Sequence, residues 1–144
     1  MNRLLRASVV VLVLIGGFAA GLNAQRQRAS PNPTDAWQAE RAFHLGMIME
    51  RARANYRDTL TKVEIGTMAP IDVKATQEAL TEMEALVKAD ATRTTKPSPW
   101  VGTRRQLAEM LDALDFDDMR FQNGMVTTRS MSDAYLEIVK LLVK

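Results

Sequence analysis

Two stretches with helical periodicity are separated by a short link that contains Gly66 and Pro70, and this arrangement restricts the fold most strongly. Residues 36–65 contain no proline, and their apolar positions recur every three or four residues, as one face of an α-helix requires. These apolar positions are Leu45, Met49, Ala52, Tyr56, Leu60 and Val63. Gly66 can end this helix in the left-handed conformation, and Pro70 suits the first turn of the next helix. The link therefore predicts an antiparallel helical hairpin over residues 35–91.

The second helix of this hairpin carries apolar residues at alternating spacings of three and four, which is typical of a coiled-coil seam. The seam residues are Val73, Leu80, Met83 and Val87, with Thr76 between the first two. We expect them to hold the hairpin together.

The link itself forms the tip of the hairpin. It lacks the several glycines or the lysine that a phosphate-binding loop would need, so the sequence predicts a turn and no chemistry there. We expect the tip to contact a partner. Its predicted contact residues are Thr67, Met68, Pro70 and Ile71.

The C-terminal part is predicted to form a short helical unit over residues 103–144, after a linker at residues 92–102. Thr103 begins a possible capping box, and acidic residues near the end of that helix oppose its macrodipole, so we expect a break near Asp115. Asn-Gly at 123–124 predicts a turn, and a last helix is expected from about Ser132. No segment alternates as a half-buried strand does. The predicted class is all-α, with two or three shorter helices after the hairpin.

The N-terminus has the pattern of an export signal. Arg3 and Arg6 precede residues 7–24, which carry no charge and include small residues suited to signal-peptidase cleavage. An uncleaved membrane anchor is the alternative, since this run is close to the roughly 20 residues that a span needs. Cleavage would leave a soluble protein, whereas an uncleaved segment would hold the chain at the membrane through residues 7–24. Under both alternatives we expect residues 25–34 to form a flexible tether and the remainder to lie outside the cytoplasm, in the periplasm.

Charge and cysteine content exclude several classes of function. The chain has 19 basic and 17 acidic residues, so the two numbers become equal when Arg3 and Arg6 are left out. A chain with no net charge does not favour nucleic-acid binding. The absence of cysteine excludes thiol catalysis, cysteine-ligated zinc and iron–sulfur clusters. The sole histidine has no serine in a recognisable nucleophile elbow. We therefore expect a protein that is not an enzyme and holds no cofactor.

The alternative to a contact protein is a periplasmic metal-binding or metal-sensing module. His44 and Met47 are three residues apart and share a helix face, and imidazole and thioether donors suit copper. A complete site would need a third ligand from another helix or chain. The competing interpretation is that the methionines fill gaps in a helical core.

The segment "ANYRDTLTKVEIGTMAPIDVKATQEALTEMEALVKAD", residues 54–90, resembles the coiled-coil hairpins of TolC-like outer-membrane efflux proteins. Tyr56, Gly66, Asp72 and Val73 occur there in the same order. The resemblance implies a shape only, an envelope hairpin whose tip could meet another hairpin. The sequence thus predicts an exported envelope protein that acts by contact with a partner or by self-association through the hairpin.

Overall fold

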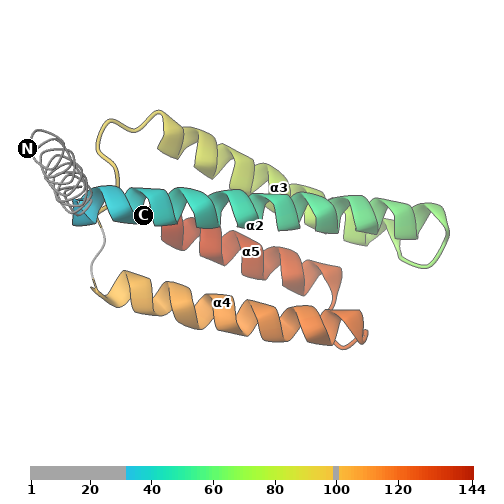
Figure 1. Cartoon of the computed structure of the whole chain (residues 1–144). Coiled ribbons are helices and arrows are strands. Elements are labelled where there is room, and N and C mark those ends of the chain that lie inside the picture. The colour runs from blue at the N-terminus through green and yellow to red at the C-terminus, as the bar shows by residue number, and fades with distance from the viewer. Residues whose placement is uncertain (1–31, 99–100) are drawn as a thin grey trace, which may run out of the picture. The chain divides into compact units, whose positions relative to one another are not determined.

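The computed structural model describes residues 32–98 and 101–144, and within these ranges the chain is helical with no strand. The helices are α2 (Pro33–Glu64), α3 (Pro70–Ala91), α4 (Val101–Gln122) and α5 (Thr128–Val143), as Figure 1 shows. The predicted all-α class is confirmed. The predicted signal or anchor, residues 1–24, and the tether up to residue 31 lie outside the described residues. None of the described helices is long and apolar enough to cross a membrane.

The hairpin turn forms as the glycine and the proline predict. Gly66 has φ 77°, its N–H donates to the carbonyl of Val63 at 3.0 Å, and the N–H of Thr67 donates to the carbonyl of Lys62 at 2.8 Å. These two bonds satisfy carbonyls at the end of α2 in the manner of a Schellman motif. Pro70 is the first residue of α3. Gly124, with φ 71°, ends α4 in the same way: its N–H donates to the carbonyl of Phe121 at 2.9 Å, and the N–H of Met125 donates to the carbonyl of Arg120 at 2.8 Å.

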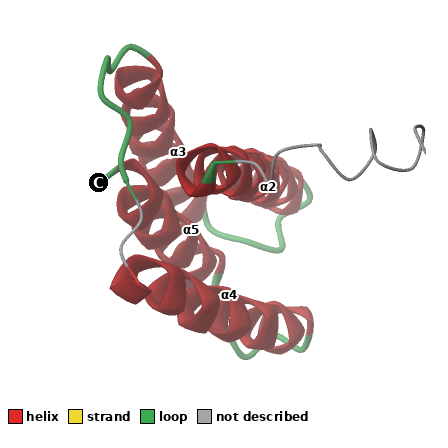
Figure 2. Ribbon diagram, turned by 60° about the vertical axis from the view of Figure 1, so that its left-hand side comes forward, coloured by secondary structure: helices red, strands yellow, loops and turns green. Residues whose placement is uncertain are grey.

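α5 is the central helix. It packs against α2, α3 and α4, whereas among the described residues α4 packs its backbone only against α5 (Figure 2). Residues 33–144 form one compact unit, so the hairpin and the C-terminal helices share a core. α5 begins at Thr128, earlier than the expected Ser132, because the Thr127 hydroxyl accepts a hydrogen bond from the N–H of Ser130 at 3.1 Å and so caps it.

The predicted break in α4 near Asp115 is wrong, because α4 is continuous through that position. Asp115 and Asp118 contact Arg51 of α2 at 3.3 and 3.2 Å, and Asp117 contacts Arg120 at 3.4 Å. These cations offset the unfavourable placement of acidic residues near the helix end. The helix also begins at Val101, so the expected capping residue Thr103 lies inside its first turn and is buried.

The buried face of α2 differs from the predicted stripe in its second half. Tyr56, Leu60 and Val63 are only half-buried, while Asn55 and Thr59 are buried in their place. The Asn55 amide donates to the hydroxyl of Ser132 at 2.9 Å and to the carbonyl of Thr128 at 3.2 Å. Because these hydrogen bonds satisfy the buried amide, α2 presents a polar residue to α5 there.

Candidate functional site

The hairpin tip exposes two large apolar side chains. Ile65 and Ile71 flank the turn and are each 67% exposed. Thr67 and Pro70 are exposed as well, while Met68 is half-buried, with its sulfur 3.8 Å from the Thr128 hydroxyl. Both the N–H and the hydroxyl of Thr67 donate to the carbonyl of Lys62, and these bonds hold the start of the tip against the end of α2. It lies at the end of the hairpin opposite the C-terminal end of α5 (Figure 1).

The predicted seam residues of α3 differ in burial. Met83 is 1% exposed, whereas Val73, Leu80 and Val87 are half-buried. Because α3 packs against α5 as well as α2, its contact surface is wider than a two-helix seam. Thr76 and Ala79 are also buried on it.

A buried ion pair joins the two helices of the hairpin near the C-terminal end of α5. Arg41 of α2 contacts Asp90 of α3, and each residue is 4% exposed. The guanidinium of Arg41 also donates from Nε to the carbonyl of Leu142. Arg41 thus connects α2 to α3 through Asp90 and to the end of α5 through Leu142. The last carbonyls of a helix such as α5 have no partner within the helix and need donors from elsewhere.

Two further cations surround Asp90. Arg93 lies 4.0 Å from its carboxylate and donates to the carbonyl of Val143 at 2.8 Å, and the Lys96 ammonium lies 3.8 Å from the same carboxylate. This cluster was not predicted from the sequence. One signal was available, because Arg41 lies four residues from both Trp37 and Leu45, in register with the buried face of α2.

An apolar groove of about 720 Å³ runs between α2 and α3. Among the described residues, its walls come from these two helices alone: Ala42, Leu45, Gly46, Met49, Glu50, Arg53, Glu84, Val87, Lys88 and Ala91. A Cβ atom on Gly46 would meet no atom of residues 32–98 or 101–144 within 4 Å. Arg53 contacts Glu50 at 3.0 Å and Glu84 at 3.3 Å. The groove therefore combines an apolar floor with charged residues of both signs.

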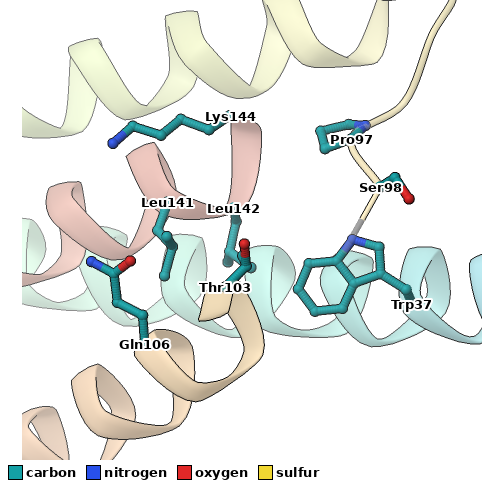
Figure 3. Close-up of a pocket in the computed structure, with 8 residues that line it drawn as sticks. All are labelled: Trp37, Pro97, Ser98, Thr103, Gln106, Leu141, Leu142 and Lys144. Carbon is teal, nitrogen blue, oxygen red and sulfur yellow. The ribbon is translucent and has the colours of Figure 1, made fainter. Parts of the chain in front are cut away.

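A smaller cavity of about 260 Å³ lies between the start of α2, the start of α4 and the end of α5 (Figure 3). It is lined by Trp37, Pro97, Ser98, Thr103, Gln106, Leu141, Leu142 and Lys144. The indole nitrogen of Trp37 is buried without a hydrogen-bond partner among the described residues. Because that atom is itself covered from solvent, a molecule in the cavity could not reach it without movement of the surrounding residues.

A third site lies where α2, α4 and α5 meet, around Arg51, Asp118 and Tyr135. Burial raises the pKa of Asp118, and Asp115 and Asp117 raise it further, while Arg51 lowers it. Burial, with a smaller contribution from Asp118, raises the pKa of Tyr135 from 10.0 to about 12. The phenol therefore stays protonated at neutral pH and is no base there.

His44 and Met47 are both half-buried on α2. The Nδ1 atom of His44 has no hydrogen-bond partner among the described residues, and its ring packs edge-on against Phe43 with centroids 5.4 Å apart. Met47 packs against the core. In residues 32–98 and 101–144, no three histidine, aspartate or glutamate side chains are grouped as a metal site would need. Metal binding by His44 and Met47 stays a prediction.

Comparisons with protein-family models, with curated proteins and with solved structures found no match to this chain. The resemblance of residues 54–90 to TolC-like hairpins stays a resemblance of one segment. The tip exposes two isoleucines beside polar residues, and the groove combines an apolar floor with charged residues of both signs.

Proposed function

We propose that this chain is an exported, non-enzymatic protein of the cell envelope that acts by binding another protein with the tip of its hairpin. The observation that carries the proposal is the pair of isoleucines, Ile65 and Ile71, that flank the turn and are each 67% exposed. The proposed location rests on the sequence, where Arg3 and Arg6 precede the uncharged residues 7–24.

The fold itself does not require isoleucine at these two positions. Both side chains leave most of their surface in water, and the turn is held by backbone bonds and by the Thr67 hydroxyl. Exposed apolar residues that lie together and are rimmed by polar ones commonly mark protein-binding sites. The hydrogen bonds that hold the turn also reduce the conformational entropy that the tip loses on binding, which favours affinity.

Site-specific crosslinking tests this role, because the chain has no cysteine and one introduced thiol is unique. We expect Ile71→Cys, labelled with a photoactivatable crosslinker in intact cells of its host, to give one discrete adduct. The matched control is Glu78→Cys, an exposed position on the side of α3 away from the groove. It should give no such adduct.

A second variant links the adduct to the tip. Adding Ile65→Ser to Ile71→Cys should reduce the adduct severalfold, because the anchor beside the thiol is lost. The melting temperature should stay unchanged, because Ile65 is mostly exposed. An adduct from Glu78→Cys of equal yield, or none from Ile71→Cys, would rule out the tip as the contact.

A further inference from the structure

The charged residues around the groove between α2 and α3 are arranged in register. The contact of Arg53 with Glu84 at 3.3 Å fixes which positions of the two antiparallel helices are level. Glu50 lies three residues before Arg53 on α2, a shift of about 4.5 Å along the helix axis. Lys88 lies four residues after Glu84 on α3, a shift of about 6 Å. Both shifts run in the same direction because the helices are antiparallel. Glu50 is therefore nearly level with Lys88. By the same count, Gly46 is level with Ala91.

Charge thus alternates along the groove and between its two helices. At one level α2 carries the cation and α3 the anion, Arg53 with Glu84. At the next level α2 carries the anion and α3 the cation, Glu50 with Lys88. Within the described residues Lys88 makes no ion pair and is exposed. At the third level both helices carry small residues, Gly46 and Ala91, which permit a close approach.

We propose that this groove binds a second copy of the same chain, with the twofold axis parallel to the hairpin. This axis places α2 of each copy against α3 of the other at the same level and in antiparallel orientation, so the two hairpins form a four-helix bundle. Glu50 then faces Lys88 of the second copy, and Arg53 faces Glu84 of the second copy. Gly46 faces Ala91 of the second copy, and the apolar floors cover each other.

Charge complementarity favours a second copy over other occupants. The rim has two acidic and two basic residues, so a peptide of one charge sign or an anionic membrane surface would meet like charges along half of it. A second copy matches the pattern at every level because it carries the same pattern. This inference rests on the proposed role in protein contact and names one partner, but it uses a surface apart from the tip.

Charge-swap variants of the full chain test the proposal. Tagged and untagged copies are co-expressed, and the yield of untagged chain recovered with tagged chain is measured in mild detergent. Glu50→Lys should reduce its self-association roughly tenfold, because two like-charge pairs replace two attractive ones. Lys88→Glu should do the same. Copies of Glu50→Lys and Lys88→Glu should associate with each other as the wild type does, since the swapped charges match again.

The matched control is Glu78→Lys, which makes the same charge change on the outer side of α3 and should leave self-association unchanged. Circular dichroism should show the same helix content in all variants. A wild type that does not self-associate would overturn the proposal. So would a Glu50→Lys variant that self-associates as the wild type does, because association would then use another surface.

Gly46→Leu gives an independent test based on shape. A Cβ atom at Gly46 meets no atom of the described residues within 4 Å and leucine favours helix, so the melting temperature of the dilute protein should rise. Self-association should fall at least severalfold, because leucine prevents the close approach to Ala91 of the second copy. Unchanged self-association would contradict the groove interface. Crosslinking from the tip is measured separately, so failure of one proposal is distinguishable from failure of the other.

Discussion

α4 and α5 are consecutive helices that are held in the molecule in different ways. α5 has 16 residues and buries nine of them, whereas α4 has 22 and buries Thr103, Leu107 and Leu114. The backbone of the shorter helix packs against the other three helices, while that of the longer one packs against α5 alone among the described helices. Position in the bundle, and not length, therefore decides how much a helix contributes to the core.

The ion pairs and hydrogen bonds that hold the two helices also differ in burial. The C-terminal end of α5 is bound by Arg41, which is buried and paired with Asp90. α4 is bound to α2 by Arg51, with Asp115 and Asp118, and by Arg104 with Glu40, and all of these side chains are substantially exposed to water. Similar ion pairs therefore contribute unequally to stability, because solvent screens the exposed ones.

The largest effect is expected from the buried pair that holds α5. Arg41→Met should lower the free energy of unfolding by about 4 kcal/mol, because it leaves the Asp90 carboxylate buried with weaker partners and the Leu142 carbonyl without its donor. Urea denaturation measures this loss. The double variant Arg41→Met with Asp90→Leu should recover most of it, since no charge is then buried unpaired. A loss below about 1 kcal/mol in the single variant would contradict the buried pair.

The next effect compares apolar truncations in the two helices. Ile138→Ala in α5 should cost about 3 kcal/mol, because Ile138 is 1% exposed in the helix that contacts all the others. Leu107→Ala in α4 should cost about 2 kcal/mol, because a peripheral helix can shift to close the cavity. Urea denaturation of the two variants tests this order: at equal m-value, Ile138→Ala should have the lower denaturation midpoint. Equal costs would mean that α4 is as firmly held as α5.

A smaller effect is expected at alkaline pH where α5 faces α4. Tyr135 has an unfolded-state pKa near 10.0 and a folded-state pKa of about 12, so the folded state holds its proton over a wider pH range. Its contribution to stability is complete below pH 10 and is lost as the pH rises toward 12. We expect wild type to lose roughly 1 kcal/mol more than Tyr135→Phe between pH 9 and 11. Parallel curves for the two proteins would contradict the raised pKa.

The smallest effect is expected from the exposed pairs of α4. Arg51→Ala removes the contacts with Asp115 and Asp118 and should cost less than about 1 kcal/mol. Thermal melts at low and high salt measure it, and the difference from wild type should shrink in high salt. A loss as large as that of Arg41→Met would show that burial does not explain the contrast between the two helices.

The hairpin could be predicted from the sequence because its signals are local. Gly66 and Pro70 act through their own backbone preferences, and both perform the expected role. The break near Asp115 was predicted by the same kind of local reasoning and is absent. The cations that offset the acidic residues include Arg51, which lies 64 residues before Asp115 in the chain, and periodicity does not reveal such a partner.

The candidate surfaces were predicted less completely. Ile71 was among the expected tip residues, but Ile65 was placed at the end of the first helix without a role. The groove was not predicted, because its walls combine residues from two helices and their register follows from the contact of Arg53 with Glu84. The buried pair of Arg41 and Asp90 was missed because charged residues in helices usually lie on the surface.

The bond from Arg41 to the Leu142 carbonyl joins positions 101 residues apart, whereas Arg53 and Glu84 of the hairpin are 31 apart. Closing the longer loop costs more chain entropy and needs the longer diffusive search. We therefore expect the hairpin to form first and the arrival of α5 to limit the folding rate, which stopped-flow refolding of Ile138→Ala would show as slower folding. The protein would then fold more slowly than its local contacts alone suggest. The apolar side of the hairpin would be exposed to water between the formation of the hairpin and the docking of α5.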